Sequence, residues 1–374
     1  MKRVELNLHE GMYPALIGQH LLTRPESWPA GGPQRKALVL MDAGVDAAWP
    51  ELQQDIQQGL QAAGWLAECL CLPAGEELKD FARLYPLYGE LLQRGLQRRS
   101  LLVAVGGGTL GDAVGFLAAT YLRGLDWVNV PTTLLAQVDS ALGGKTGVNH
   151  PAGKNLIGAI YQPQRILCDT TLLQQLPARD WLSGYGEMLK YGLIHDEPLW
   201  HWLLQQRDAL LRGDASLLEE AVARSLAIKA HFVAQDVRDL TGIRAVLNFG
   251  HTFGHAIEQV TGYGYYRHGE AVILGMYLAC QVSQRFGVLP GSAGERLSQA
   301  LAALPLPQLP AQITAEDLLA VMRHDKKNDG EAIHCLLLRG IAEIIPYPCS
   351  STELAPALKS ALANWRQSAA ATTT

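Results

Sequence analysis

Short apolar segments alternate with amphipathic segments along the first half of the chain. Apolar runs of strand length occur at 37–41, 66–72, 101–105, 127–130 and 165–168. Between them, apolar residues recur with helical spacing, as at 52–64 and 84–96. Because buried strands joined by helices form parallel sheets, this alternation predicts an α/β domain with a mostly parallel sheet.

The pattern changes after residue 176, where long stretches of helical periodicity follow one another. They cover 199–211, 216–235, 269–287, 293–304 and 315–324. The proline-rich stretch 304–312 is expected to be a loop between helices. We therefore expect two domains, a parallel-sheet domain over 1–175 and a helical domain over 176–374.

Composition narrows the kinds of partner. A chain of 374 residues with 48% hydrophobic residues is long enough for two cores. The formal net charge of -5 argues against a nucleic-acid partner, and small molecules are expected instead. The six cysteines lack metal or redox spacing, which is typical of a reducing compartment. No signal peptide and no apolar run of about 18 residues is found, so a cytoplasmic location without membrane contact is expected.

A glycine turn follows the third apolar run. Residues 101–105 read as a buried strand, Gly106 to Asp112 as a turn, and the apolar residues after it as a helix. This arrangement directs backbone N–H groups at a pyrophosphate, although an ordinary tight turn is the alternative. Its position far from the domain start indicates a variant dinucleotide-binding fold. Thr132 and Thr133 end the next strand, at the edge where ligands of such sheets bind.

Histidines gather in the predicted helical domain. His251 and His255 are four residues apart and share one face of a helix, but the glutamate of the zinc-protease motif is absent. His268 begins the next helix, and Glu187 lies in SGYGEMLKYG together with Lys190. One carboxylate and two imidazoles suit a catalytic zinc site. Histidines of the core or surface are the alternative, and the residues alone leave the choice open.

Several cationic residues have glycine or apolar neighbours, which a solvated surface charge does not need. Together they could bind a carboxylate and a phosphate, whereas each one alone could be a surface charge. They are Lys145, Lys154, Lys190, Lys229, Arg244, Lys326 and Lys327.

Six motifs in this order resemble the 3-dehydroquinate synthases. They are GGGTLGD, VPTTLLAQVDSALGGKTGVNHPAGKNLIGA, SGYGEMLKYG, RAVLNFGHTFGHAIE, RHGEAV and HDKKNDG, and the similarity extends over about residues 1–348. The resemblance implies an N-terminal Rossmann-like domain, a C-terminal helical domain, an active site in the cleft between them, and a homodimer. It also implies NAD and one divalent metal ion, zinc or cobalt, as cofactors.

The same resemblance implies roles for individual residues. The metal ligands would be Glu187, His251 and His268, so that His255 contacts substrate. The residues implied for NAD are Asp42, Glu76, Lys79, Gly107, Gly108, Thr109, Leu110, Gly111, Asp112, Thr132, Thr133, Lys145 and Lys154. Those implied for the substrate are Asp139, Lys145, Asn155, Lys190, Lys229, Arg244, Asn248, His255, Lys326 and Lys327, with Arg123 reaching a neighbouring subunit's phosphate site.

The chain departs from the family pattern at three places. Asp42-Ala43-Gly44 replaces the usual Asp-x-Asn near the adenosine end of the cofactor. The stretch before Arg244 is one residue longer and carries Asp239 in place of a glutamate. GYGE replaces the commoner GLAE beside Glu187, which retains the carboxylate but changes the packing around it.

The implied reaction converts 3-deoxy-D-arabino-heptulosonate 7-phosphate to 3-dehydroquinate and phosphate, a step of aromatic amino acid biosynthesis. It combines transient oxidation by NAD, phosphate elimination, reduction and intramolecular aldol closure. The alternatives are another sugar-phosphate cyclase, a metal-dependent polyol dehydrogenase and a non-catalytic binding protein. Arg244 favours a substrate with a carboxylate, since arginine binds carboxylates in a bidentate manner. The lysine set favours a cyclase over a dehydrogenase.

Overall fold

The computed structural model describes residues 1–8, 11–323 and 332–371, and the chain groups into two compact units. The first unit comprises Met1–Pro177 and Asp208–Arg238, and the second comprises Ala178–Arg207 and Asp239–Thr374. This grouping differs from the continuous 176–374 segment expected from the sequence. The difference arises because helix α7 (Ala215–Gln235) packs on strands β1 (Lys2–Leu8) and β2 (Gly11–Gly18) of the first unit.

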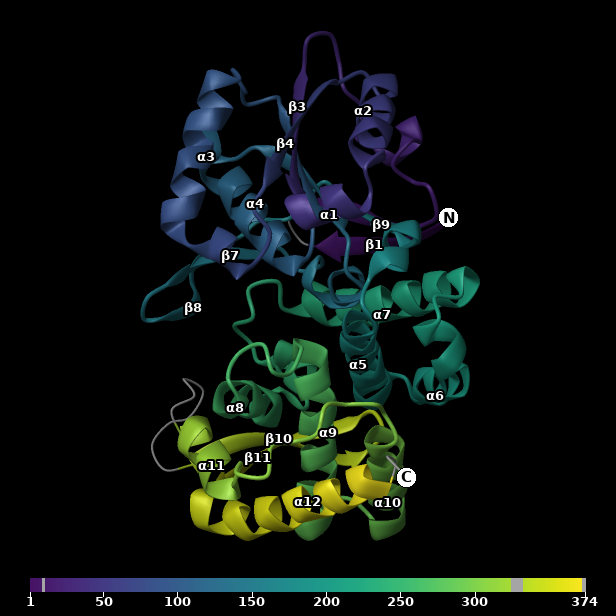
Figure 1. Cartoon of the computed structure of the whole chain (residues 1–374), viewed down its shortest axis with the longest axis vertical. Coiled ribbons are helices and arrows are strands. Elements are labelled where there is room, and N and C mark those ends of the chain that lie inside the picture. The colour runs from purple at the N-terminus through teal and green to yellow at the C-terminus, as the bar shows by residue number, and fades with distance from the viewer. Residues whose placement is uncertain (9–10, 324–331, 372–374) are drawn as a thin grey trace. The chain divides into compact units, whose positions relative to one another are not determined.

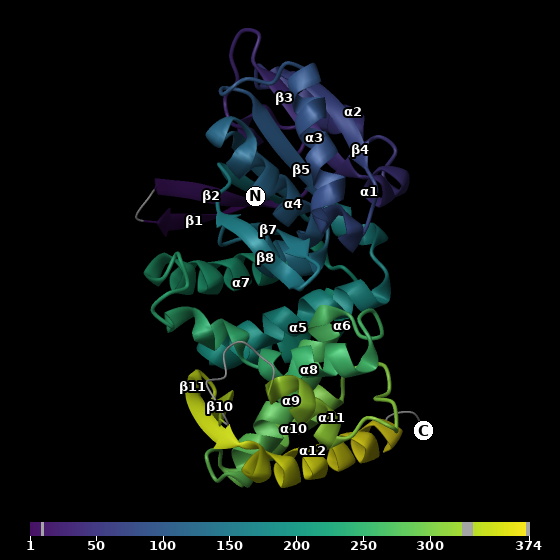
Figure 2. The same cartoon turned by 90° about the vertical axis from the view of Figure 1, so that its left-hand side faces the viewer.

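A twisted sheet forms the centre of the first unit (Figures 1 and 2). Within the described residues it has seven strands in the order β1-β2-β9-β6-β5-β3-β4, and only β1 runs antiparallel to its neighbour. The five predicted apolar runs form its parallel core, so the prediction of a parallel α/β domain is confirmed. These strands are β3 (Lys36–Asp42), β4 (Leu66–Leu72), β5 (Leu101–Gly106), β6 (Asp126–Pro131) and β9 (Arg165–Asp169).

Both faces of this sheet are buried, because successive side chains of a strand point to opposite faces. Leu38 and Leu40 of β3 pack under helices α3 (Phe81–Gln93) and α4 (Gly108–Thr120). Val39 of the same strand packs under α2 (Leu52–Ala62) on the other face. Figure 1 shows α3 and α4 on one side of β3 and β4, and α2 on the other. Helices on both faces fix the sheet as a rigid platform.

The carboxyl ends of the parallel strands are in register. Asp42 at the end of β3 pairs with Leu72 at the end of β4, and Gly106 at the end of β5 pairs with Pro131 at the end of β6. The segments that leave these strands therefore begin along one edge of the sheet, the edge at which open α/β sheets bind ligands.

Smaller elements complete the first unit. They are η1 (Pro25–Ser27), α1 (Ala43–Ala48), η2 (Glu76–Lys79), η3 (Tyr121–Arg123), the π-helical turn η4 (Ala136–Ser140), η5 (Thr170–Gln175) and the hairpin of β7 (Lys145–His150) with β8 (Gly153–Ile160).

Helix α9 (His268–Arg285) is the centre of the second unit. It is buried along nearly its whole length and packs against α5, α8, α10 and α12. The other helices are α5 (Ala178–His195), α6 (Glu197–Leu211), η6 (Ile243–Asn248), α8 (His251–Thr261), α10 (Gly291–Ala302), α11 (Ala315–Arg323) and α12 (Ser351–Ala371). The predicted helical character of this part is confirmed, and 304–312 is a loop as expected. None of the helices in the described part of the chain combines the length and apolarity needed to cross a membrane.

The second unit also contains a hairpin that the sequence did not predict. Strand β10 (Ala332–Gly340) pairs antiparallel with β11 (Glu343–Ser350), in a register that sets Leu336 opposite Pro346. Proline lacks the N–H that a sheet ladder uses, so its presence at 346 and 348 argues against a strand in sequence reading. A two-stranded hairpin accommodates prolines because each strand has an open edge.

The crossing of α8 and α9 depends on glycine. A Cβ atom at Gly275 would lie 2.1 Å from the carbonyl oxygen of Gly250 and 2.8 Å from the amide nitrogen of Gly254. We therefore expect Gly275→Ala to push the two helices apart and to destabilise the protein by about 1–3 kcal/mol, as overpacked cores do. The check is the thermal unfolding midpoint, which should fall.

Gly291→Ala provides the matched control. Gly291 begins α10, and a Cβ atom there would meet nothing within 4 Å. Because helical glycine is less favourable than alanine by up to about 1 kcal/mol, this variant should be as stable as the parent or more stable. Equal midpoints for Gly275→Ala and the parent protein would contradict the close helix crossing.

Candidate metal centre and nucleotide edge

Three helices of the second unit direct one carboxylate and three imidazoles toward one another. Glu187 lies on α5, His251 and His255 lie on the first turns of α8, and His268 is the first residue of α9. The ring nitrogens of the three histidines include a set that lies within 4.8 Å of one another. Nε2 of His251 is 3.5 Å and Nε2 of His268 is 3.7 Å from Oε1 of Glu187. Residues that are far apart in the sequence thus converge as the metal hypothesis requires.

The far ring nitrogens of two of these histidines face acceptors. Nδ1 of His251 lies 3.2 Å from the backbone oxygen of Phe249, and Nδ1 of His268 lies 3.4 Å from Oε2 of Glu258. Metal-binding histidines commonly donate their second N–H to a carbonyl or carboxylate, which fixes the tautomer. With Nδ1 as the donor, Nε2 of both rings presents a lone pair on the side of Glu187.

Glu258 was not predicted as a site residue. It is seven residues after His251, so both side chains project from one face of α8. This spacing within HTFGHAIE was the signal that could have identified it.

The Glu187 carboxylate is fully buried, yet among the described residues no donor with hydrogen-bond geometry reaches either of its oxygens. It forms a close ion pair with Lys190, one turn further along α5. Burial, followed by the charges of Lys190 and the neighbouring histidines, lowers the pKa of His251 well below its usual value. A buried carboxylate with unsatisfied lone pairs beside imidazole nitrogens has the donor chemistry of a divalent-cation site.

Two ligand sets fit this geometry. Glu187 with His251 and His268 is the set implied by the family resemblance, and the three histidines together are the other. The two sets differ in whether Glu187 or His255 is the third ligand. His255 is exposed to solvent, whereas the oxygens of Glu187 are buried and lack hydrogen-bond donors, which favours the set that contains Glu187.

The GYGE departure lies where α5 meets α9. A Cβ atom at Gly186 would lie 2.5 Å from the backbone oxygen of Gly269 and 2.9 Å from Cγ1 of Ile273. The glycine therefore allows α5 to approach α9 closely, next to the two proposed ligands Glu187 and His268.

The glycine turn of the first unit has the predicted strand–turn–helix form. Strand β5 ends at Gly106, Gly107 caps α4 without a side-chain hydrogen bond, and the helix starts at Gly108. Thr132 is buried, and its amide donates to the backbone oxygen of Gly106, which ties the ends of β5 and β6 together. The first amides of α4 thus open at the carboxyl edge of the sheet, where a helix N-terminus favours an anion.

Residues from η2 and α4 form a polar network at this edge. Glu76 accepts hydrogen bonds from Thr109 at 2.9 Å and Asn149 at 2.8 Å. Burial opposes ionisation of Glu76, but these bonds and the charges of Lys79 and Lys154 lower its pKa overall. Glu76 is therefore an anionic hydrogen-bond acceptor, suited to hydroxyl groups of a ligand.

Buried Lys79 occupies the centre of the network. Its Nζ lies 2.8 Å from Oδ2 of Asp112 and donates to the side-chain oxygen of Asn155. Burial raises the pKa of Asp112 despite the opposing charge of Lys79. Lys79, Asp112 and Asn155, predicted as cofactor or substrate residues, are thus in direct contact. Asn149 was missed, because an isolated asparagine in a long polar block carries no spacing signal.

Asp42 is engaged by its own helix. Its carboxylate caps α1 by accepting from the amides of Gly44 at 2.8 Å and Val45 at 3.4 Å. The predicted contact of Asp42 with NAD is not tested by this arrangement.

Two residues that were each implied for the substrate, Lys229 and Asp139, are in contact in the first unit. Nζ of Lys229, on α7, lies 2.8 Å from Oδ1 of Asp139 and donates to the backbone oxygen of Asp139 at 2.7 Å. The side chain of Lys229 is nearly buried, so its charge is compensated by this carboxylate. The ion pair fixes the ammonium group at η4, next to the start of the β7–β8 hairpin that carries Lys145.

The remaining predicted residues are placed individually. Arg244 is buried in η6, which also holds Asn248 and packs against α5. Asp239, at the second departure, has a positive φ of 57° in the preceding loop. Arg123 is exposed and also has a positive φ. Lys326 and Lys327 lie outside the described residues.

Solved structures with this fold include sugar-phosphate cyclases and a glycerol dehydrogenase from Schizosaccharomyces pombe, which has a TM-score of 0.69 and 19% identity, with 96% of this chain and 91% of that chain covered. A 2-deoxy-scyllo-inosose synthase complexed with carbaglucose-6-phosphate, NAD+ and Co2+ has a TM-score of 0.86 and 24% identity, with 96% of this chain and 99% of that chain covered. A 2-epi-5-epi-valiolone synthase from Streptomyces hygroscopicus with NAD+ and Zn2+ bound has a TM-score of 0.82 and 26% identity, with 96% and 98% covered. The fold is thus one that sugar-phosphate cyclases share with dehydrogenases, and the two cyclases have the higher TM-scores.

Sequence comparison identifies the family among proteins of this fold. Residues 69–183 match the family description "3-dehydroquinate synthase N-terminal", and residues 184–328 match "3-dehydroquinate synthase C-terminal". The 3-dehydroquinate synthase of Syntrophotalea carbinolica is 41% identical over 92% of this chain and 94% of its own length. The chain belongs to the 3-dehydroquinate synthase family.

The contact between His268 and Glu258 yields a prediction. Glu258→Gln should leave the ring of His268 with a weaker acceptor and lower the affinity for Zn2+ by about 10- to 100-fold, as loss of such supporting carboxylates does. The measurement is a competition titration of metal-free protein with a chromophoric chelator. Unchanged affinity in Glu258→Gln would show that the carboxylate does not support the ring.

Proposed function

We propose that this chain converts 3-deoxy-D-arabino-heptulosonate 7-phosphate to 3-dehydroquinate and phosphate. It would act as a carbon–oxygen lyase and as a cyclase. Membership of the 3-dehydroquinate synthase family over both domains supports the activity. The observation that carries it is the convergence of Glu187, His251 and His268, three residues whose ligand role the family resemblance implies.

We further propose that the chain uses NAD and one divalent cation, zinc or cobalt. A cation held by Glu187, His251 and His268 would supply Lewis-acid polarisation of the substrate hydroxyl that is oxidised. NAD, when bound, would take up a hydride and return it within the same turnover, so that no net redox change results. The solved cyclases with NAD+ and Co2+ or Zn2+ support this choice of cofactors.

The first unit supplies the proposed cofactor groups. The amides at the start of α4 would bind the pyrophosphate, because a helix N-terminus favours anions. The ionised carboxylate of Glu76 would accept hydrogen bonds from hydroxyl groups of NAD. Lys79 would keep this edge neutral enough for an anionic cofactor, since its charge offsets that of Asp112.

The substrate carries a carboxylate and a phosphate, and the proposed groups for both are cationic or amide side chains. Arg244 is buried, so its fixed fork is suited to bidentate binding of the carboxylate. Asn248 follows in the same turn η6. Lys229 is held by Asp139, and Lys190 lies against Glu187 and 4.8 Å from the ring centroid of Tyr191. Ammonium groups fixed in this way lose little freedom when they bind an anion.

His255 is proposed to move a proton near the departing phosphate. Its ring centroid lies 5.4 Å from that of His251 and 5.8 Å from that of His268, so it borders the metal ligands while being exposed. Imidazole can serve as acid or base near neutral pH, which a metal-bound imidazole cannot.

The assembly and location are proposed from the family resemblance alone. We propose a cytoplasmic homodimer in which Arg123 reaches the phosphate site of the neighbouring subunit. Lys145, Asn155, Lys326 and Lys327 are proposed as further substrate contacts on the same basis.

The test is an assay of the metal-loaded protein with 3-deoxy-D-arabino-heptulosonate 7-phosphate and catalytic NAD+. We expect one phosphate and one 3-dehydroquinate per substrate, no accumulation of NADH, and loss of turnover on chelation. His268→Ala should abolish turnover and serves as the inactive control. Absence of phosphate release would contradict the proposal, and steady NADH formation from a polyol would indicate a dehydrogenase instead.

A pair of variants distinguishes the two ligand sets. Glu187→Gln should lose most of the affinity for Zn2+, because it removes an anionic ligand. His255→Ala should keep the metal within about threefold of the parent affinity but lower turnover by about 10²- to 10⁴-fold, the usual contribution of an acid–base group. Metal content after equilibrium dialysis measures the first effect. Loss of metal in His255→Ala with retention in Glu187→Gln would establish the three-histidine set.

A further inference from the structure

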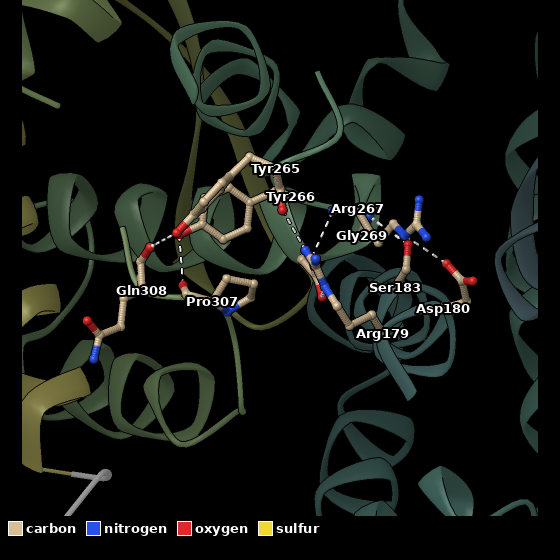
Figure 3. Close-up of polar contacts among 10 residues, drawn as sticks. Arg179, Asp180, Ser183, Tyr265, Tyr266, Arg267, Gly269, Pro307 and Gln308 are labelled. Atoms are coloured by element: carbon tan, nitrogen blue, oxygen red, sulfur yellow. Dashed lines mark hydrogen bonds and ion pairs between the residues drawn. The ribbon is translucent and has the colours of Figure 1, made fainter. Parts of the chain in front are cut away.

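The first turn of α9, which begins with His268, is tied to the start of α5 by a partly buried ion pair (Figure 3). Nε of Arg179 lies 2.8 Å from Oε1 of Glu270, and Nη2 of Arg179 lies 2.5 Å from Oε2. The Glu270 carboxylate is fully buried, whereas the Arg179 side chain is 45% exposed. A two-bond pair of this kind fixes both distance and orientation between the two helices.

Glu270 also fixes the backbone on which His268 stands. Its Oε2 accepts a hydrogen bond of 2.8 Å from the amide of Arg267, the residue before the helix. Glu270 is the third residue of α9, the position from which a glutamate side chain reaches back to cap the helix start. The same carboxylate thus binds α5 through Arg179 and sets the first turn of α9.

The residue after His268 is held to α5 as well. The amide of Gly269 donates to Oγ of Ser183 at 3.0 Å, and a Cβ atom at 269 would lie 1.8 Å from the backbone oxygen of Ser183. Ser183 is one helical turn before Glu187, on the same face of α5. His268 therefore lies between Arg267 and Gly269, whose backbone positions are both fixed by contacts that lead to α5, the helix that carries Glu187.

The loop before α9 is anchored from both sides. Arg179 Nη2 donates to the backbone oxygen of Tyr265 at 2.6 Å. The hydroxyl of Tyr265 donates to the backbone oxygen of Gln308 at 2.7 Å, and that of Tyr266 to the backbone oxygen of Pro307 at 2.9 Å. Figure 3 shows these contacts in one continuous arrangement around the loop. Loss of Arg179 would remove a contact that the loop and the helix start share.

We propose that Arg179 and Glu270 are positioning residues, which set the distance between His268 and Glu187 and thereby the affinity of the site for a divalent cation. Neither residue touches the proposed ligands' metal-facing atoms. The inference rests on the proposed metal site and adds to it two residues that act through the start of α9.

A purely electrostatic effect would have a different signature. Arg179→Met removes a positive charge and leaves the Glu270 carboxylate without its ion-pair partner. If charge alone mattered, this variant would bind a cation more tightly than the parent. Glu270→Gln removes a negative charge, so by charge alone it would bind a cation more weakly. Positioning requires both variants to bind more weakly, because each breaks the same connection between α5 and α9.

The experiment titrates metal-free full-length protein with Zn2+ and Co2+ against a chromophoric chelator, and records the visible spectrum of the Co2+ form. We expect Arg179→Met and Glu270→Gln each to weaken metal affinity about 10- to 100-fold and to change the Co2+ spectrum. The metal affinity of the double variant should lie within about twofold of that of the weaker-binding single variant. Two substitutions that break one shared contact do not have additive effects.

Asp180→Asn is the matched control. Asp180 lies next to Arg179 in α5 and forms a 3.1 Å ion pair with Arg267 at the start of α9, but both of these side chains are partly exposed. The metal affinity of Asp180→Asn should stay within about twofold of the parent affinity, as expected for the loss of a partly exposed ion pair. Arg179→Lys, which keeps the charge but not the two-bond geometry, serves if Arg179→Met does not fold, and it should also weaken binding.

Three outcomes would overturn the inference: parent-like affinity in Arg179→Lys and Glu270→Gln, tighter binding by folded Arg179→Met, or equal weakening in Asp180→Asn. Failure of the proposed metal site is distinguishable, because the parent protein would then bind neither Zn2+ nor Co2+, and failure of the proposed activity would show as absence of phosphate release. If the parent binds metal and the Arg179 and Glu270 variants bind it with the same affinity, only the positioning role is contradicted.

Discussion

The second unit depends on a carboxylate that is buried without hydrogen bonds. Among the described residues, no donor with the required geometry reaches the oxygens of Glu187, although the ammonium group of Lys190 and two imidazole nitrogens lie near them. Lys190 offsets the charge of Glu187, but buried carboxylate oxygens without hydrogen-bond donors remain unfavourable. The arrangement is explained if a divalent cation completes it, because the lone pairs then have a partner.

The packing of the surrounding helices brings these side chains together. Glu187, His251 and His268 can converge only if α5, α8 and α9 approach closely, and glycines occupy the points of approach. Gly186 and Gly269 lie between α5 and α9, and Gly250 and Gly275 lie between α8 and α9. Imidazole orientation is then set by acceptors on α8 and before it, namely Glu258 and the backbone of Phe249.

The first unit pairs its charged groups, as the second unit does with Arg179 and Glu270. Its acidic and basic groups compensate one another directly, as in Lys79 with Asp112 and Lys229 with Asp139. These pairs keep side chains ordered at the sheet edge without a metal.

The sequence predicted those features that depend on local pattern. The five apolar runs are strands β3, β4, β5, β6 and β9, and the glycine turn does join a strand to a helix. Periodicity predicted α7 but not its placement with the first unit, since an amphipathic helix does not specify which surface covers it. Helical spacing alone would have paired His251 with His255, whereas the approach of Glu187 from another helix depends on tertiary packing. The β10–β11 hairpin was missed because prolines interrupt its second strand.

The most direct test of the ligand set is X-ray absorption spectroscopy of the zinc-loaded protein at the zinc edge. Imidazole ligands give outer-shell scattering that a carboxylate does not, so the spectrum counts the histidines bound to the metal. The arrangement around Glu187 predicts two imidazoles and additional oxygen ligands. A spectrum that requires three imidazoles would contradict it and would assign the buried carboxylate a role other than metal binding.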